Sequence, residues 1–299
     1  MIKRCLVTGG AGFIGSHIVD QLIELNADVI VIDNLSTGKI QNLNTKAKFI
    51  QLDLSTATQS ELNNYFSNID VVFHCAALPN VQYSIEFPVE SSKANTDTTI
   101  KVLEAIRYNH INKIIYSSSC SVYGNASKIP TCESAVISPL SAYALQKYIG
   151  EEYCYLYNKI YNINYIVLRY FNVYGERMDD KGAYVGVLSH FLQAYKHNNP
   201  LNITNDGNQK RDFIYVKDVA NANILAAISK VNNDIFNIGS GYNHSINTIA
   251  EWFGLPKKYG EKRIEPSETL SNINKAKSVL GWEPKQYLDH WIQTSLQRK

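Results

Sequence analysis

The stretch Thr8-Gly-Gly-Ala-Gly-Phe-Ile-Gly15 decides the fold that this chain is expected to adopt. It follows a short apolar run at residues 2–7, which predicts a buried strand, and it leads into helix-compatible sequence at residues 13–26. Glycines recur at every third position of the stretch, at Gly9, Gly12 and Gly15. Such glycines allow a tight turn and a close backbone approach, and the following helix points its N-terminus at a pyrophosphate. The stretch therefore predicts a dinucleotide site.

Apolar runs alternate with helical sequence through the rest of the first half of the chain. The runs that predict buried strands are residues 28–33, 48–53, 69–74, 113–117 and 164–169. Helices are expected at residues 88–109 and 143–161. This alternation predicts a parallel sheet covered on both faces, with ligands bound beyond the carboxyl ends of the strands. The predicted fold class is α/β, with a doubly wound, Rossmann-like parallel sheet.

The alternation becomes irregular after residue 169, which suggests a second domain. A loop is expected at residues 176–180, helices at 184–197 and 216–230, and a strand at 234–239. We predict a dinucleotide-binding domain at residues 1–170, to which residues 212–240 return. A smaller α/β C-terminal domain, formed by residues 171–211 and 241–299, would bind the substrate.

Composition restricts the partners and the compartment. The 299 residues are enough for one large α/β unit or two modest domains, and 45% of them are hydrophobic. The net charge of +2 argues against nucleic acid or a membrane surface as the main partner. The five cysteines show no Cys-x-x-Cys pair and no metal-ligand spacing, so we expect reduced thiols, a cytoplasmic location and no bound metal. The first strand begins at Ile2 and no apolar run approaches the ~18 residues of a membrane span, so neither a signal peptide nor a membrane segment is expected.

Residues at the ends of the next strands favour NAD as the dinucleotide. Asp33 ends the second strand, where a carboxylate accepts hydrogen bonds from the adenosine ribose and repels a 2′-phosphate. No arginine follows it directly. Asp53-Leu54 would face the adenine, although a simple helix cap also explains Asp53. Ala76-Ala77 are small enough to let the cofactor approach, although ordinary packing also explains them.

Tyr143 and Lys147 are the predicted catalytic pair. A spacing of four residues places both side chains on one face of a helix. A nearby ammonium favours the phenolate, lowers the pKa of the tyrosine and lets it take a proton from an alcohol. A Tyr-x-x-x-Lys pair often arises by chance, so its weight here comes from its agreement with the glycine-rich turn.

Seven motifs in order along the chain resemble those of the extended short-chain dehydrogenase/reductase family. Within that family the chain is most similar to the NAD-dependent nucleotide-sugar epimerase/dehydratase group, and to the UDP-hexose and UDP-N-acetylhexosamine 4-epimerases in particular. The motifs are Thr8–Gly15, Asp33–Gly38, His74–Ala77, Ser117–Gly124, Tyr143–Lys147, Arg169–Gly175 and Arg211–Val216. The resemblance covers nearly the whole chain, and it is more specific for the family than for the reaction.

The resemblance implies roles for individual residues. Tyr143 would be the acid/base, Lys147 would hold the nicotinamide ribose, and Ser119 would hydrogen-bond the reacting sugar oxygen. The implied NAD-binding residues are Gly9, Gly12, Phe13, Ile14, Gly15, Asp33, Asn34, Ser36, Thr37, Gly38, Asp53, Leu54, Ala76, Ala77, Asn95, Tyr143, Lys147 and Tyr170. The implied substrate-binding residues are Pro79, Asn80, Ser119, Tyr143, Asn172, Gly186, Val187, Arg211, Arg263 and Thr269.

The implied reaction is epimerisation at C4 of a UDP-sugar through a transient 4-keto intermediate. Dehydratases of the family carry an Asp-Glu pair after the serine, and Cys120-Ser121 cannot supply that acid and base. UDP-glucuronate decarboxylases stay open, because their Arg-x-Phe-Asn-Thr-Tyr-Gly motif is close to Arg169–Gly175. A silent NAD-binding protein is the alternative of another class, but such proteins usually lose the Tyr, the Lys or the Ser that this chain keeps.

The resemblance also addresses the substrate pocket. Arg211 would pair with the diphosphate, and Arg263 or Lys262 would add a second charge. Thr269 and Gly186 align with wall positions that are larger in enzymes restricted to plain hexoses. We therefore expect UDP-N-acetylglucosamine/N-acetylgalactosamine to be accepted, with UDP-glucose/galactose as additional candidates.

A homodimer is expected from the same resemblance. Helices at residues 91–109 and 143–161 pair into a four-helix bundle in dimers of this family. The second helix is rich in tyrosine, at Tyr148, Tyr153, Tyr155, Tyr157 and Tyr161. Tyrosine is enriched at interfaces, although packing within one subunit also explains such a set.

Overall fold

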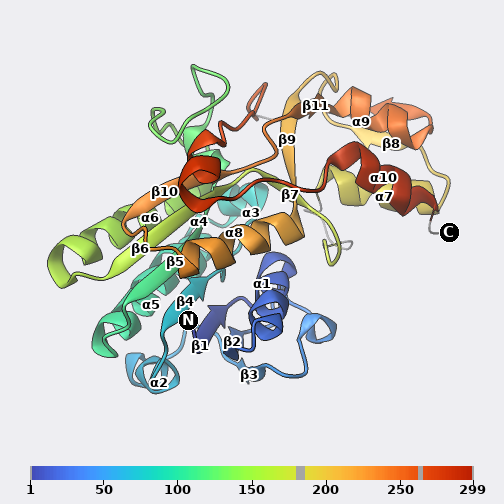
Figure 1. Cartoon of the computed structure of the whole chain (residues 1–299). Coiled ribbons are helices and arrows are strands. Elements are labelled where there is room, and N and C mark those ends of the chain that lie inside the picture. The colour runs from blue at the N-terminus through green and yellow to red at the C-terminus, as the bar shows by residue number, and fades with distance from the viewer. Residues whose placement is uncertain (1, 180–185, 262–264, 298–299) are drawn as a thin grey trace.

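A seven-stranded parallel sheet forms the centre of the computed structural model, which describes residues 2–179, 186–261 and 265–297 (Figure 1). Its strands are β1 (Arg4–Thr8), β2 (Asp28–Asp33), β3 (Lys48–Gln51), β4 (Val71–His74), β5 (Lys113–Ser119), β6 (Asn164–Tyr170) and β10 (Asp234–Ile238). Their order is β10-β6-β5-β4-β1-β2-β3, and every neighbouring pair is parallel. The predicted doubly wound α/β fold is confirmed.

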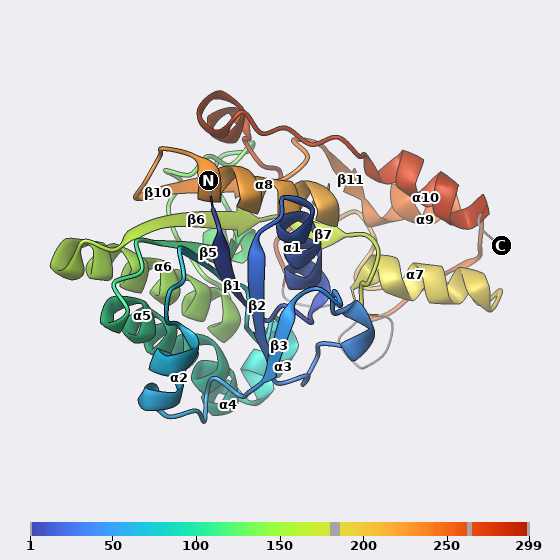
Figure 2. The same cartoon turned by 60° about the horizontal axis from the view of Figure 1, so that its bottom comes forward.

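Helices cover both faces of this sheet, which explains why the central residues of its strands are mostly apolar and buried. Helices α1 (Phe13–Glu24) and α8 (Val216–Ile228) pack on one face, against alternate strand residues such as Cys5 and Val7. Helices α2 (Gln59–Tyr65), α5 (Thr98–Tyr108) and α6 (Ala142–Tyr161) pack on the other, against Leu6 and its equivalents (Figure 2). Since successive side chains of a strand point to opposite faces, each strand contributes to two separate cores.

The helix expected at residues 88–109 is interrupted by a wider turn. It comprises α4 (Pro88–Ser92), a π-helical turn at Lys93–Asp97 and α5. Helix α3 (Val81–Glu86) precedes it and was not predicted. Single π-helical turns inside α-helices often accompany functional sites.

Smaller differences from the predicted bounds have local causes. The strand expected at residues 69–74 begins at Val71, because the Asp70 carboxylate accepts hydrogen bonds from the backbone of Lys3 and Arg4. The strand expected at 48–53 ends at Gln51, before the turn that the Asp53 carboxylate forms with Ser55.

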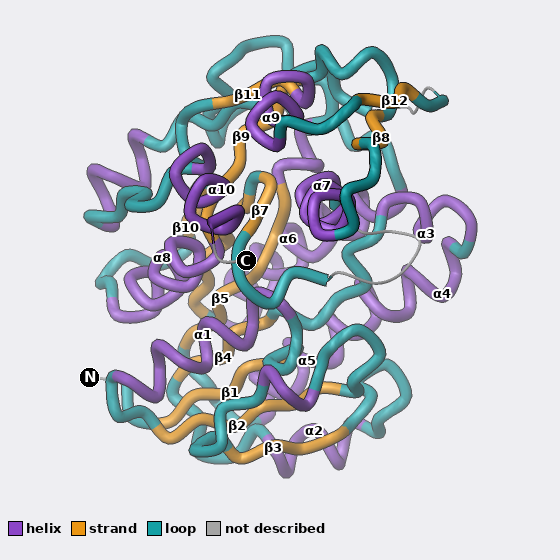
Figure 3. The backbone as a smooth tube through the Cα atoms, turned by 90° about the vertical axis from the view of Figure 1, so that its right-hand side faces the viewer, coloured by secondary structure: helices purple, strands orange, loops and turns teal. Residues whose placement is uncertain are grey.

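A smaller lobe carries the remaining strands (Figure 3). Its three-stranded sheet has the order β11 (Asn243–Ser245), β9 (Lys210–Tyr215), β7 (Asn172–Tyr174), and β8 (Leu201–Ile203) pairs with β12 (Lys257–Tyr259). Helices α7 (Val187–Lys196), α9 (Ile246–Phe253) and α10 (Leu288–Gln297) pack around a separate apolar core. Shorter helical turns lie at Ile40–Asn42, Cys120–Tyr123 and Ala276–Leu280.

The chain passes between the two lobes more than once. β9 pairs within the small sheet, whereas α8 and β10, which follow it, return to the large one. The exact division into domains at residues 170, 211 and 240 stays a prediction. In the part of the chain that the structure describes, no helix combines the length and apolar character that crossing a membrane requires.

Candidate active site

The glycine-rich turn lies against the exit of β4, with no space for side chains. Gly9 has φ +69°, and a Cβ on it would lie 2.7 Å from the backbone nitrogen of Ala76. A Cβ on Gly15 would lie 2.2 Å from the Gly9 carbonyl oxygen, which already accepts a hydrogen bond from the Gly12 nitrogen at 3.1 Å. Phe13 begins α1 directly after this turn. The turn is therefore a bare backbone cradle at a helix N-terminus, which fits a pyrophosphate.

The carboxylate of Asp33 faces the same turn. It is buried, and it accepts hydrogen bonds from the backbone nitrogens of Ala11 at 3.0 Å and Leu35 at 2.8 Å. A Cβ on Gly38 would lie 2.8 Å from it, so Gly38 leaves space beside the carboxylate. A carboxylate has lone pairs for about four hydrogen bonds, and those that remain fit the hydroxyls of a ribose.

Asn34 and Asp53 meet at the same edge of the sheet. The Asn34 side-chain amide donates to Asp53 at 3.2 Å, and the Ser55 hydroxyl donates to it at 2.7 Å. Burial alone would raise the pKa of Asp53, but the hydrogen bonds from Ser55 and Asn34 leave it below the usual range. The Asn34 oxygen accepts from the Ser36 backbone, and Leu54 is buried beside Asp53. Asp53 therefore caps a turn and not a helix, because the N-cap of the following helix α2 is Thr58.

A buried polar chain supports the loop after β4, and the sequence analysis missed it. Ala76 donates its N–H to the Thr8 hydroxyl at 3.3 Å, and that hydroxyl lies 2.7 Å from His74 Nδ1. His74 Nε2 lies 3.0 Å from the Thr99 hydroxyl, which donates to the Asn95 carbonyl at 2.7 Å. Because Thr99 donates onward, His74 must carry its proton on Nε2 and accept from Thr8 on Nδ1. Burial lowers the pKa of His74 to about 3, which keeps the ring neutral.

The three predicted catalytic residues come together where β5 ends and α6 begins. Ser119 ends β5, and Ser141 caps α6 by accepting from the Ala144 nitrogen at 3.2 Å. Tyr143 lies in the first turn of α6 and is buried, and the side chain of Ser119 lies beside its phenol. Burial raises the pKa of Tyr143 to about 12, and the interaction with Ser119 works in the opposite direction.

The pKa of Tyr143 is raised by burial and not lowered overall, which is opposite in direction to the expectation from sequence. The Nζ of Lys147 donates to the Ser117 carbonyl at 2.8 Å and lies 5.3 Å from the centre of the Tyr116 ring. Burial lowers the pKa of Lys147 to about 8, while Cys75 and Glu151 favour its charge. The ammonium is thus held by the end of β5, and burial dominates the pKa of both catalytic side chains.

A buried ion pair lies behind this group and was also missed. Arg169 contacts Glu151 through Nη2 at 2.5 Å and Nε at 2.9 Å, and both side chains are at most 3% exposed. Ser118 donates to the same carboxylate, and Arg169 also donates to the Tyr123 hydroxyl at 2.9 Å. The pair joins α6 to β6, and Ser118 connects it to the end of β5 next to Ser119.

Two predicted cofactor residues make buried contacts instead of presenting free polar groups. The Tyr170 hydroxyl lies 3.1 Å from the Ser117 hydroxyl and bonds Asn223 at 2.8 Å. The Asn95 side chain holds the backbone of Leu78, with 2.7 Å between Asn95 Oδ1 and the Leu78 nitrogen. Tyr170 and Asn95 therefore hold neighbouring parts of the site, the end of β5 and the loop after β4, in place.

The predicted substrate residues lie mainly in the smaller lobe. Asn172 donates to the Asp212 carbonyl at 2.9 Å and to the Thr269 hydroxyl at 3.4 Å, so the two predicted substrate residues Asn172 and Thr269 are adjacent. Gly186 precedes Val187 at the start of α7, and a Cβ on Gly186 would meet nothing within 4 Å among the described residues.

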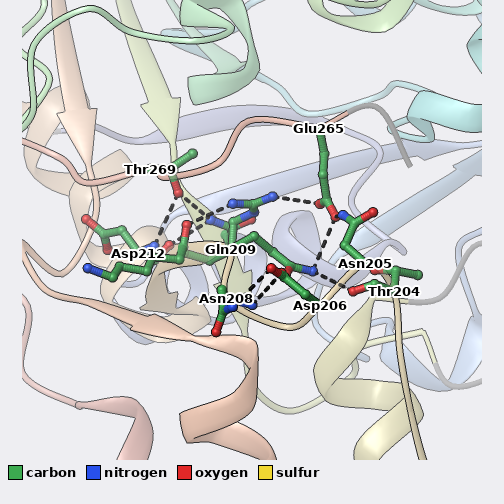
Figure 4. Close-up of polar contacts among 11 residues, drawn as sticks. Thr204, Asn205, Asp206, Asn208, Gln209, Asp212, Glu265 and Thr269 are labelled. Carbon is green, nitrogen blue, oxygen red and sulfur yellow. Dashed lines mark hydrogen bonds and ion pairs between the residues drawn. The ribbon is translucent and has the colours of Figure 1, made fainter. Parts of the chain in front are cut away.

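Arg211 is paired with a carboxylate that the sequence analysis did not identify. Its Nη2 lies 2.6 Å from Glu265, and its Nη1 donates to the Lys210 carbonyl at 2.8 Å. Glu265 also accepts from Asn205 at 2.7 Å and from Gln209 at 3.4 Å (Figure 4). Lys262 and Arg263 lie outside the described residues.

The model of the NAD-dependent epimerase/dehydratase family matches residues 5–239. This chain belongs to that family. NAD is therefore its cofactor, in agreement with the bare glycine cradle and the buried Asp33. The predicted family resemblance is confirmed.

Similar proteins include several sugar-nucleotide enzymes. A putative UDP-glucose 4-epimerase of Methanocaldococcus jannaschii is 47% identical over 96% of this chain and 95% of its own length. The structure of a UDP-glucose 4-epimerase of Thermotoga maritima with UDP-glucose has a TM-score of 0.93 at 37% identity and covers 98% and 97% of the two chains. A UDP-N-acetylglucosamine 4-epimerase of Methanobrevibacter ruminantium gives 0.93 at 36% identity, with 99% and 97% covered. A UDP-N-acetyl-alpha-D-glucosaminuronate decarboxylase of Bacillus cytotoxicus is 35% identical over 84% of this chain and 79% of its own length.

Proposed function

We propose that this protein is an NAD-dependent 4-epimerase of UDP-sugars. The observation that carries the proposal is the placement of Ser119, at the end of β5, beside the phenol of Tyr143, with Lys147 one helical turn further along α6. This arrangement offers a hydroxyl donor and a phenol to one oxygen atom of a ligand. The names of similar proteins that act on UDP-glucose and UDP-N-acetylglucosamine support the same reading.

The residues suggest a simple proton cycle. Tyr143, as the phenolate, removes the proton of the sugar 4-hydroxyl, while Ser119 hydrogen-bonds that oxygen. NAD, when bound, supplies the reversible hydride acceptor. Loss of hydride from C4 gives a 4-keto sugar, and its return to the opposite face inverts the centre as Tyr143 gives back the proton. No net oxidation results.

Inversion requires one end of the substrate to stay fixed while the hexose turns. In the proposed mechanism Arg211 and Asn172, on neighbouring strands of the small sheet, hold the diphosphate end, and the diphosphate then competes with Glu265 for Arg211. Binding energy at that remote end keeps the reacting end in the site.

We further propose that the hexose pocket admits an N-acetyl group at C2. The open space at Gly186 and the small side chain of Thr269 support this. The test is Thr269→Tyr, with turnover of UDP-N-acetylglucosamine compared with that of UDP-glucose. Loss of the acetylated substrate alone supports the assignment, and equal turnover of both sugars rejects it.

A decarboxylase is the second candidate, because a decarboxylase is among the similar proteins. Product analysis by NMR separates the candidates, using a panel of UDP-sugars that includes UDP-glucuronic acid and no added reductant. A 4-epimer without added reductant supports the proposal, whereas carbon dioxide from UDP-glucuronic acid supports the alternative. Tyr143→Phe should retain NAD and lose turnover.

The proposed enzyme is a cytoplasmic homodimer. Exposed apolar side chains on α5 and α6 support an interface, among them Tyr108, Leu156, Ile160 and Tyr161. All five cysteines are free thiols, as suits a reducing compartment. Sedimentation velocity tests the assembly: a dimer that Leu156→Glu dissociates is expected, and a wild-type monomer at working concentration contradicts it.

A further inference from the structure

We propose that Gln146 is a positioning residue that fixes the loop Leu78–Asn80 against the catalytic helix, so that the loop can hold the hexose. The proposal rests on the proposed function, because it assigns this loop to the sugar end of the substrate. Gln146 lies between Tyr143 and Lys147 on α6 and is only 5% exposed. Nothing in its sequence context distinguishes it from a helix-surface residue.

The side-chain oxygen of Gln146 receives two hydrogen bonds from the helix that contains the π-helical turn. Asn95 Nδ2 donates to it at 2.7 Å, and the Ser91 hydroxyl donates at 2.8 Å. Ser91 and Asn95 are 0% and 3% exposed, so no solvent replaces this acceptor. Removing it would leave the buried Ser91 hydroxyl without its acceptor, and Asn95 Nδ2 with only the Leu78 carbonyl at 3.2 Å and Ser91 Oγ at 3.4 Å. Such a loss is costlier than losing an exposed hydrogen bond.

Asn95 passes this constraint on to the loop. Its Oδ1 accepts from the Leu78 nitrogen at 2.7 Å, and its Nδ2 donates to the Leu78 carbonyl at 3.2 Å. The amide therefore clamps the backbone of Leu78 from both sides. Its orientation is fixed, because Oδ1 must face an N–H group while Nδ2 faces the oxygen of Gln146.

A second contact ties the far side of the loop to the same helix. The Tyr143 backbone nitrogen donates to the Ser84 hydroxyl at 3.0 Å, and that hydroxyl donates to the Val81 carbonyl at 2.7 Å. Asn80 caps α3 by accepting from the Tyr83 nitrogen at 2.7 Å. Hydrogen bonds thus fix the loop at Leu78 and just after Asn80, and both sets of bonds connect it to α6.

Pro79, which lies between these two fixed positions, is exposed. A loop held at both ends with an outward-facing middle offers a preorganised surface to a ligand, and preorganisation reduces the ordering entropy lost on binding. Without Gln146 the loop would have to be ordered by the sugar itself. The resulting loss of affinity should appear in hexose binding, while the nucleotide end, held by the smaller lobe, keeps its affinity.

The test compares Gln146→Met, which keeps the length of the side chain and removes the acceptor, with Leu145→Met. Leu145 precedes Gln146 on α6 and is 47% exposed. We expect Gln146→Met to raise KM for UDP-glucose and UDP-N-acetylglucosamine about tenfold, the effect of roughly one hydrogen bond to a buried group. Gln146→Met should keep the Kd of free UDP and the amount of bound NAD within about twofold of wild type. Leu145→Met should change neither the KM for UDP-sugars nor the Kd of UDP.

Ser91→Ala, which removes one donor and is expected to fold, should raise KM by a smaller factor. In the double variant with Gln146→Met its effect should vanish, because both changes act on one interaction. Equal weakening of UDP and UDP-sugar binding, or an unchanged KM in both single variants, would overturn the proposal. If the wild type does not epimerise any UDP-sugar, the proposed function fails; the positioning role then fails separately if calorimetry shows that Gln146→Met leaves UDP-sugar binding unchanged.

Discussion

The side chain of Ser119 lies beside the phenol of Tyr143 and favours its phenolate. Burial opposes this effect and raises the pKa of Tyr143 to about 12. Since Lys147 is occupied by the Ser117 carbonyl at 2.8 Å, Ser119 has the more direct influence on the acid/base.

Ser119→Ala should therefore raise the pKa of Tyr143 further. A higher pKa lowers the phenolate fraction at any given pH, so the rising limb of the plot of kcat against pH should move to higher pH. At pH 7 we expect kcat to fall about tenfold or more, since one pKa unit corresponds to a factor of ten in the phenolate population. Ser119→Thr keeps the hydroxyl and is the control. A Ser119→Ala profile that is only lower, with no displacement along the pH axis, contradicts the argument.

The Glu151–Arg169 pair should be essential for stability, because neither charge reaches water. Glu151→Gln leaves the Arg169 guanidinium buried without its counter-charge, and breaking such a pair in this way destabilises by about 3–5 kcal/mol. Glu152→Gln, the neighbouring and exposed position, should change the free energy of unfolding by about 0.5 kcal/mol at most. Urea denaturation of both variants checks this. Similar losses of unfolding free energy in the two variants would show that the buried pair stabilises the protein no more than an exposed side chain does.

His74 should make the protein sensitive to mild acid. Its folded-state pKa of about 3 lies below the usual value of 6.5, so the unfolded chain binds the proton first as the pH falls. The stability associated with the neutral ring is fully present above pH ~6.5 and is lost progressively as the pH falls towards 3. Between pH 7 and pH 5 this amounts to about 2 kcal/mol.

His74→Gln isolates this effect, because an amide cannot titrate and can still donate to Thr99. Other acidic groups titrate equally in both proteins, so the difference in stability between pH 7 and pH 5 belongs to His74. Denaturant titrations at the two pH values should show the variant losing about 2 kcal/mol less than wild type. If wild type and His74→Gln lose the same stability between pH 7 and pH 5, His74 is not buried as a neutral ring.

The large sheet was predictable because its signals are local. The run before Gly9 is apolar at residues 5–7 and the run that ends at Asp33 is apolar at residues 29–32, as covered strands require. The short strands β8 and β12 were missed because three residues carry no usable periodicity. Their place is set by the core around Phe191 and Phe253, which forms only in three dimensions.

The candidate site divides in the same way. Tyr143 and Lys147 share one helical turn, so their spacing reveals them, whereas Arg211 and Glu265 are 54 positions apart and no pattern joins them. Gln146 was overlooked because a polar residue on a helix usually faces water. The direction of the pKa shift of Tyr143 was predicted wrongly because the degree of burial cannot be read from the sequence.

Gly15 should decide whether the protein retains its cofactor. A Cβ at this position would lie 2.2 Å from the Gly9 carbonyl oxygen, so Gly15→Ala must displace the turn that faces the pyrophosphate. Alanine favours a helix by about 1 kcal/mol over glycine, which offsets part of the strain and keeps the fold within reach. We expect Gly15→Ala to purify folded, with NAD content reduced at least tenfold and activity restored only by a large excess of added NAD.

Gly260→Ala provides the matched control, since among the described residues its Cβ would have only the Ile203 carbonyl oxygen nearby, at an ordinary 3.7 Å. Far-UV circular dichroism, thermal unfolding and the absorbance of NAD released by heat measure the three quantities in parallel. If Gly15→Ala retains NAD as fully as Gly260→Ala does, the pyrophosphate does not lie against this turn. The cofactor would then have to enter the cleft in another orientation, and the placement of the nicotinamide beside Tyr143 would lose its main structural support.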